Sequence, residues 1–145
     1  MADKTVLLVE DKPSDVRLVM EALKETGFKA SVSVVGNGEE AIDFLLKTGR
    51  YEKAPTPDLI LLDLKLPKKN GHEIIQKVRE TDGISNMPII VLSNSDSATD
   101  VEKSYKYRAN CYLVKPINMP DFIDLVKTIE KFWLNDVTLP KKHGI

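Results

Sequence analysis

The sequence alternates short apolar runs with longer amphipathic segments, and this alternation is the feature that most limits its fold. Strands separated by helices need crossover connections, and such strands pair in parallel within one sheet. The pattern therefore predicts an α/β protein with a doubly wound, five-stranded parallel sheet covered by helices on both faces. The five expected strands are residues 5–9, 31–35, 59–62, 89–93 and 111–114.

Four of these runs are almost continuously apolar, which is typical of strands covered on both faces. Residues 31–35 instead alternate serine with valine, as expected for a half-exposed strand at the edge of a sheet. The last run contains the single cysteine, Cys111, so the chain can form no internal disulfide and no cysteine metal cluster. We interpret this cysteine as a small buried hydrophobe rather than a reactive thiol.

The segments between the runs carry helix start and stop signals. Pro13 suits the first turn of the first helix, and Gly27 lies just past its end. Gly49 is expected to close the second helix. The "SATD" sequence at 97–100 is typical of a capping box for the fourth helix, and Asn118 is expected to cap the fifth. The fourth helix has the poorest apolar stripe, so we expect it to be weakly anchored and able to shift.

Composition narrows the function classes. The 145 residues include 21 Lys and Arg against 22 Asp and Glu, so no global basic field favours nucleic acid or an anionic membrane. This length suits one domain, residues 1–145, with a core that needs no disulfide or metal. The sequence contains neither a membrane-span pattern nor a signal-peptide pattern, so we expect a cytoplasmic protein.

The residues that end the expected strands carry the chemistry. Ligands of an open parallel sheet bind beyond the carboxyl ends of the strands, near the point where the strand order reverses. The strands end there on Glu10 and Asp11, on Asp63, on Ser93 and on Lys115. If the first and third strands are neighbours, three carboxylates converge and repel one another unless a cation lies between them.

Carboxylate oxygens suit Mg²⁺, which keeps several waters and needs few protein ligands. Lys115 and Ser93 could then hold the oxygens of a phosphoryl group, and Asp63 could attack it to form an aspartyl-phosphate. Each residue alone is more commonly a helix cap or a solvated side chain. Five of them at one edge of one sheet favour a site.

Four motifs, in this order, resemble the receiver domain of two-component response regulators: "VLLVEDKPSD", "LILLDLKLPKKNG", "PIIVLSNS" and "YLVKP". The resemblance covers essentially the whole chain and implies a flavodoxin-like (βα)5 fold with strand order 2-1-3-4-5. It implies a single receiver domain without an output domain. The loop at 47–57, "SYKYRANCYLVKPIN" and the terminal "FW" are most similar to small receivers that partner phytochrome-type histidine kinases.

The resemblance also implies a role for each residue at the acidic end of the sheet. Asp63 is the phosphoacceptor, and Asp11, Asp63 and the backbone carbonyl of Lys65 are the Mg²⁺ ligands. Glu10 acts through metal-bound water. Lys65 and Ser95 are expected to border the approach of the water that hydrolyses the phosphoaspartate.

Three further residues take switch or pairing roles by the same resemblance. Ser93 is the switch hydroxyl, and Tyr112 is the switch aromatic, although a tyrosine there could also merely cover the sheet edge. Lys115 pairs with the phosphoryl group, and the Lys115–Pro116 peptide bond is usually cis in this family.

The implied function is phosphorelay signalling rather than classical enzyme catalysis: the domain accepts phosphoryl groups from a sensor histidine kinase and slowly dephosphorylates itself. We expect its output to be contact with a downstream protein, or a homodimer, through the fourth helix, fifth strand and fifth helix. The main alternative is a pseudo-receiver that binds proteins without phosphorylation. A flavodoxin is disfavoured by the acidic "EDKPSD" loop, and a haloacid-dehalogenase-type phosphatase by Lys65, where a second aspartate is needed.

Overall fold

The structure is a computed structural model that describes residues 4–26 and 30–142, and it contains the expected five-stranded parallel sheet. Neighbouring strands pair in the order β2-β1-β3-β4-β5. The α/β fold and the strand order are therefore confirmed. The strands are β1 (Lys4–Val9), β2 (Ala30–Val35), β3 (Leu59–Leu62), β4 (Ile89–Ser93) and β5 (Cys111–Val114).

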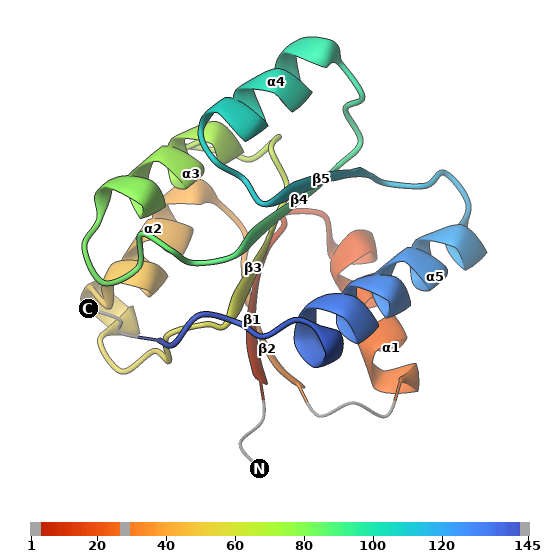
Figure 1. Ribbon diagram of the computed structural model, residues 1–145, viewed down its shortest axis with the longest axis horizontal. Helices are drawn as coiled ribbons and strands as arrows, with labels where there is room; N and C mark the ends of the chain where they lie inside the picture. The colour runs from red at the N-terminus through yellow and green to blue at the C-terminus, as the bar shows by residue number, and fades with distance from the viewer. Residues whose placement is uncertain (1–3, 27–29, 143–145) are drawn as a thin grey trace.

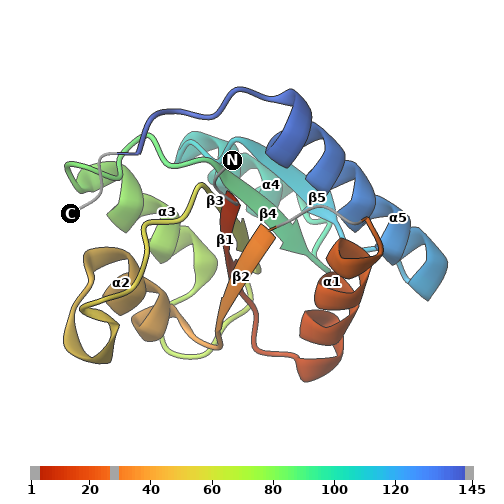
Figure 2. The same cartoon turned by 90° about the horizontal axis from the view of Figure 1, so that it is seen from below.

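Helices cover both faces of this sheet (Figure 1, Figure 2). One face carries α1 (Pro13–Glu25) and α5 (Met119–Ile129). The other face carries α2 (Gly38–Leu46), α3 (Gly71–Glu80) and α4 (Ala98–Lys106). A short 3-10 turn, η1 (Gly49–Tyr51), follows α2, and a π-helical turn, η2 (Glu130–Asp136), extends α5. Within the described part of the chain, no helix is long and apolar enough to cross a membrane.

Alternate side chains of the central strands build a separate core on each face. In β1, Leu7 and Val9 pack toward α2 and α3, whereas Val6 and Leu8 pack toward α1 and α5. All four residues of β3 are buried. The continuous apolar sequence of the central strands thus reflects burial on both faces, and it holds the carboxyl ends of β1 and β3 rigidly side by side.

The burial of one edge strand agrees with the sequence prediction, and the burial of the other does not. β2 is half-exposed, as its alternating pattern indicated. β5 forms the other edge and is only half-buried, with Val114 exposed, so the prediction that it is covered on both faces was wrong. The apolar sequence of β5 resembles that of a central strand, although β5 lies at the edge of the sheet. Cys111 packs against the α1–α5 side, and burial raises the pKa of its thiol, which disfavours the reactive thiolate.

Most helix ends agree with the sequence signals. Pro13 opens α1 as predicted, whereas Gly27 lies outside the described residues. Gly49 does not close α2. The helix ends at Leu46, and Lys47 takes the left-handed conformation (φ 58°) as its C-cap, so Gly49 instead begins η1. The helix therefore ends with a non-glycine residue in the conformation that usually favours glycine.

The caps of α4 and α5 form, but the capping box of α4 is incomplete. Ser97 accepts the backbone N–H of Asp100, and Asn118 caps α5 in the same way. The carboxylate of Asp100 accepts a hydrogen bond from Ser95 instead of turning back to the cap residue. Among the nine residues of α4, all of them described, Ser104 alone is buried, which agrees with its poor apolar stripe.

Candidate functional site

The carboxyl ends of β1 and β3 bring three carboxylates together, as the predicted topology requires. One carboxylate oxygen from each of Glu10, Asp11 and Asp63 lies within 4.8 Å of the others. Glu10 and Asp63 are buried, and Asp11 is exposed. The backbone N–H of Asp63 donates to the carbonyl of Val9 (3.0 Å), so the β1–β3 pairing continues up to the acidic cluster and sets its geometry.

Lys115 follows β5 and reaches into the same cluster. Its Nζ lies 2.5 Å from Glu10 Oε1, 2.8 Å from Asp15 Oδ2 and 3.5 Å from Asp63 Oδ2. Burial lowers the pKa of Lys115, but its hydrogen bonds to Asp15 and Glu10, together with the charges of Asp63 and Glu10, outweigh burial and raise the pKa overall. The lysine is therefore a fixed positive charge beneath the carboxylates.

Sequence reasoning missed Asp15. This residue lies in the first turn of α1, where an acidic side chain is ordinarily explained by the helix dipole. The signal that could have found it is its spacing from Asp11, because the first turn of α1 stands at the same edge of the sheet. Its contact with Lys115 joins α1 to the end of β5.

The electrostatics of the cluster favour a bound cation. Burial raises the pKa of Glu10 to about 7, the charge of Asp63 acts in the same direction, and Lys115 opposes both. A divalent cation would replace this repulsion by attraction, and the donors are hard carboxylate oxygens of the kind that bind Mg²⁺. The residues at the site therefore fit the predicted metal.

Ser93 and Tyr112 meet through the loop between β4 and α4. Ser93 is fully buried, and its Oγ accepts the backbone N–H of Ser95 (3.3 Å). The hydroxyl of Tyr112 donates to the carbonyl of Ser95 (2.7 Å). The backbone N–H of Tyr112 donates to the hydroxyl of Tyr105 on α4 (3.1 Å). The two predicted switch residues thus share one hydrogen-bonded partner.

The loop after β3 folds back onto Asp63. The backbone N–H of Lys65 donates to Asp63 Oδ1 (3.3 Å), while the exposed Lys65 side chain reaches Asp100 Oδ2 (3.3 Å). Gly71 closes the loop by donating its N–H to the carbonyl of Leu64 (3.0 Å). A Cβ at Gly71 would lie 2.7 Å from the Leu64 Cα, so the loop can close this tightly only over a glycine.

The Lys115–Pro116 peptide bond is trans, which corrects the cis geometry implied by the family resemblance. The bond before a proline prefers trans by only about 0.5–1 kcal/mol, so a short motif does not determine the isomer.

An open cleft of about 500 Å³ lies beside the acidic cluster. Its polar lining comes from the β1–α1 loop, the β3–α3 loop and the exposed side of α3 and α4. This cleft gives solvent and small anions access to the cluster. The polar residues that line it are Asp11, Lys65, Asn70, His72, Asp100 and Lys103.

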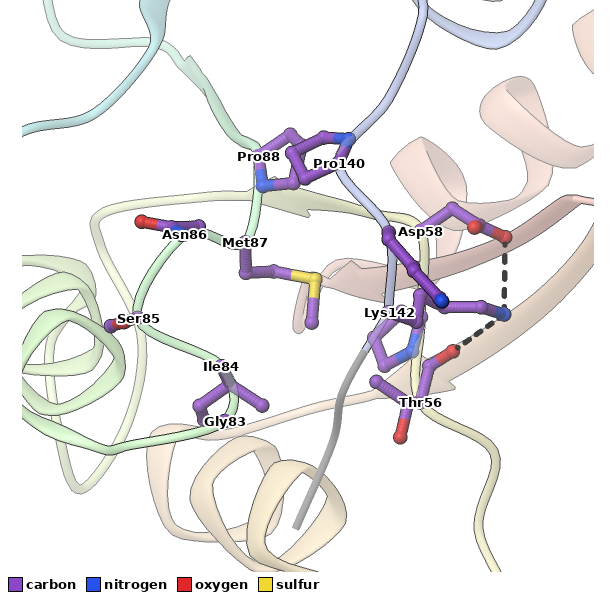
Figure 3. Close-up of a pocket in the computed structure, with 12 residues that line it drawn as sticks. Thr56, Asp58, Gly83, Ile84, Ser85, Asn86, Met87, Pro88, Pro140 and Lys142 are labelled. Carbon is purple, nitrogen blue, oxygen red and sulfur yellow. Dashed lines mark hydrogen bonds and ion pairs between the residues drawn. The ribbon is translucent and has the colours of Figure 1, made fainter.

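A second cavity, of about 70 Å³, lies at the opposite end of the sheet under the C-terminal tail (Figure 3). Lys142 lines it and donates to the carbonyl of Thr56 (3.2 Å) and pairs with Asp58 Oδ2 (3.5 Å), and Pro88 and Pro140 line it as well (Figure 3). Its volume suits a few water molecules at most. We therefore assign the chemistry to the carboxyl end of the sheet.

Residues 6–127 match the model of the response regulator receiver domain. The chain belongs to the response regulator receiver family. It is 43% identical over 137 residues to response regulator Rcp1 of Synechocystis sp., covering 94% of this chain and 93% of that protein. Receivers of this family work in phosphorelay signalling, and this is the function of the present domain.

Solved structures agree with this assignment. The phosphorylated cyanobacterial phytochrome response regulator RcpA superposes with a TM-score of 0.93 at 41% identity, covering 97% of this chain and 100% of that one. The Mn²⁺-bound form of Rcp1 superposes with a TM-score of 0.91 at 43% identity, covering 95% and 99%. The receiver resemblance read from the sequence is confirmed, including its similarity to phytochrome-associated regulators. Receivers bind a divalent metal through acidic residues, and this receiver has such a cluster.

Proposed function

We propose that this receiver accepts a phosphoryl group from the phosphohistidine of a sensor histidine kinase onto Asp63, in a Mg²⁺-dependent reaction. One observation carries the proposal. Asp63 ends a central, fully buried strand within 4.8 Å of two further carboxylates, with the Nζ of Lys115 3.5 Å away. A carboxylate held in a fixed position is suited to nucleophilic attack when cations offset the charge of its acidic neighbours and of an anionic donor.

In the transfer, a carboxylate oxygen of Asp63 attacks phosphorus, the phosphorus–nitrogen bond breaks, and its electron pair returns to the imidazole of the kinase. Lys115 neutralises charge on the phosphoryl oxygens, and the hydroxyl of Ser93 donates a hydrogen bond to one of them. Asp11, Asp63 and the carbonyl of Lys65 would hold Mg²⁺, with Glu10 acting through water, and the bound ion would supply further positive charge.

The same residues would promote slow loss of the phosphoryl group to water, so the domain acts on itself rather than on a separate substrate. The pseudo-receiver alternative is not favoured. A binding module has no need of buried carboxylates and a buried lysine clustered at one edge, because such charges are costly to bury.

We further propose that phosphorylation changes the face formed by α4, β5 and α5. Turning Ser93 toward the phosphoryl group would withdraw its hydroxyl from Ser95, which also holds Tyr112. This face and its end expose large apolar side chains that a downstream protein or a second copy of the chain could cover. They are Tyr105, Val114, Ile117, Met119 and Phe132.

Similarity to phytochrome response regulators favours a phytochrome-type kinase as the phosphoryl donor. We propose that residues 1–145 act as a single receiver domain in the cytoplasm, where ATP-dependent kinases form phosphohistidine. The net charge of −1 gives no support to a nucleic-acid partner.

The test is the intact mass of the protein after incubation with acetyl phosphate, with and without Mg²⁺. We expect a Mg²⁺-dependent gain of one phosphoryl group that is absent in Asp63→Asn. Asp124→Asn, which removes an exposed carboxylate on α5, is the matched control and should gain the group normally. A folded wild-type protein that gains no mass in Mg²⁺ would overturn the proposal and favour the pseudo-receiver.

A further inference from the structure

An ion pair spans the cleft beside the phosphoacceptor. Lys65 Nζ lies 3.3 Å from Asp100 Oδ2, and both residues line the cleft. Lys65 stands two positions after Asp63 and donates its backbone N–H to the Asp63 carboxylate. The Lys65 ammonium is therefore drawn toward α4.

Asp100 is held firmly in this position. Ser95 Oγ donates to Asp100 Oδ2 (2.6 Å), and the backbone N–H of Asp100 donates to Ser97 Oγ (3.1 Å). The Asp100 carbonyl accepts the hydroxyl of Ser104 (2.8 Å). The hydrogen bond from Ser95 is the main cause that lowers the pKa of Asp100, with Lys65 and Ser97 adding to it. The Asp100 carboxylate is therefore a negative charge held in place by hydrogen bonds. Its side chain is only 18% exposed.

We infer that Asp100 is a positioning residue for the hydrolysis of the phosphoaspartate, because it keeps the Lys65 ammonium out of the path of the attacking water. The inference rests on the phosphorylation of Asp63 proposed above. It assigns to the first turn of α4 a direct influence on how long the phosphorylated state lasts.

The chemistry determines the direction of the effect. In hydrolysis, a water oxygen attacks phosphorus opposite the Asp63 oxygen, the bond from phosphorus to that oxygen breaks, and its electron pair returns to the carboxylate. The protons of the water leave with the inorganic phosphate or pass to solvent. An ammonium has three donors and no acceptor, so Lys65 cannot remove a proton from the water. A released Lys65 would pair with the phosphoryl oxygens from the cleft side and occupy the space through which the water approaches.

The experiment compares wild type, Asp100→Asn, Lys65→Met and the double variant. Each protein is phosphorylated with acetyl phosphate and Mg²⁺ and desalted into donor-free Mg²⁺ buffer, and loss of the phosphoryl mass is followed. Asp100→Asn should decay about twofold to fivefold more slowly, the range that an ion pair supports when one partner, here Lys65, is exposed to solvent. On the Lys65→Met background, Asp100→Asn should slow the decay no further, so the double variant should decay at the rate of Lys65→Met itself.

Two further variants separate this role from a structural one. Asp96→Asn removes an exposed carboxylate from the same loop and should decay at the wild-type rate. Asp100→Glu keeps the charge and should restore most of the wild-type rate. Thermal melting of each variant shows whether it is folded. If Asp100→Asn does not fold, Asp100→Glu still tests the charge at this position.

The outcomes are distinguishable. The inference would be overturned if Asp100→Asn slowed the decay equally in the wild-type and Lys65→Met backgrounds. Asp100 would then act through the α4 cap or Ser95. An unchanged or faster decay of Asp100→Asn would overturn it as well, while the proposed function would stand. A wild-type protein that gains no phosphoryl group would overturn both together.

Discussion

Replacing Lys115 by methionine tests whether the buried lysine holds the carboxylate cluster together in the folded protein. The Lys115 side chain is 2% exposed, and its Nζ lies 2.5 Å from Glu10, 2.8 Å from Asp15 and 3.5 Å from Asp63. Methionine preserves most of the length and packing of lysine but removes its charge. The substitution therefore leaves the carboxylates without their buried counter-ion.

The expected loss can be worked out from these contacts. Removing one partner of a buried ion pair costs about 3–5 kcal/mol, because the remaining charges are left unpaired. Glu10 limits this loss: burial already raises its pKa to about 7, so in the variant it takes up a proton at neutral pH. We therefore expect the lower end of the range, about 3 kcal/mol of unfolding free energy, or roughly 6–12 °C in melting temperature.

The assay is urea unfolding at pH 7 in EDTA, followed by circular dichroism. Lys127→Met is the matched control, because Lys127 pairs with Glu25 at the surface (3.1 Å) with both side chains about half exposed. Its unfolding free energy should fall by less than about 1 kcal/mol. Adding Glu10→Gln to Lys115→Met should recover the part of the loss that comes from protonating Glu10 at pH 7, because glutamine is neutral without taking up a proton. The reasoning is refuted if Lys115→Met costs no more than Lys127→Met, or if Glu10→Gln recovers nothing.

Three further predictions test the loop, the metal and the switch. Gly71→Ala should lower the unfolding free energy by about 1–3 kcal/mol, because its Cβ would lie 2.7 Å from the Leu64 Cα. Gly36→Ala, where nothing lies within 4 Å of the new Cβ, should cost far less in the same urea titration; equal losses would contradict the crowding argument. Mg²⁺ at 100 times its dissociation constant should add about 2.7 kcal/mol to the unfolding free energy, and a melting-temperature titration should show most of this gain lost in Asp11→Asn. Tyr112→Phe removes the 2.7 Å hydroxyl bond to the β4–α4 loop and should cost about 1 kcal/mol. Amide exchange in that loop should become faster, and unchanged exchange would show that the bond does not hold it.

Much of the fold could be predicted because the deciding signals are local. "LILL" at 59–62 is continuously apolar because β3 is buried on both faces, and the serine–valine alternation of β2 marks an edge. Strand ends follow from the same patterns. Once parallel strands are expected, their carboxyl ends must share one edge, so the convergence of Glu10, Asp63 and Lys115 was predictable before any distance was known.

Other features depend on segments that only the folded chain brings together. Asp15 and Lys115 are 100 positions apart, and no pattern within either segment indicates their 2.8 Å contact. The pairing of Lys65 with Asp100 likewise joins the β3–α3 loop to the first turn of α4, and its geometry depends on how α4 is capped. The peptide bond before Pro116 is trans, and because the two isomers differ little in energy, the surrounding structure decides which one forms. By itself the sequence determined the parallel sheet and its acidic edge, because periodicity and strand ends are local, whereas the strand order followed from the resemblance to receiver domains. The tertiary structure alone decided which charges pair there, because ion pairs form between side chains that packing places within a few ångströms.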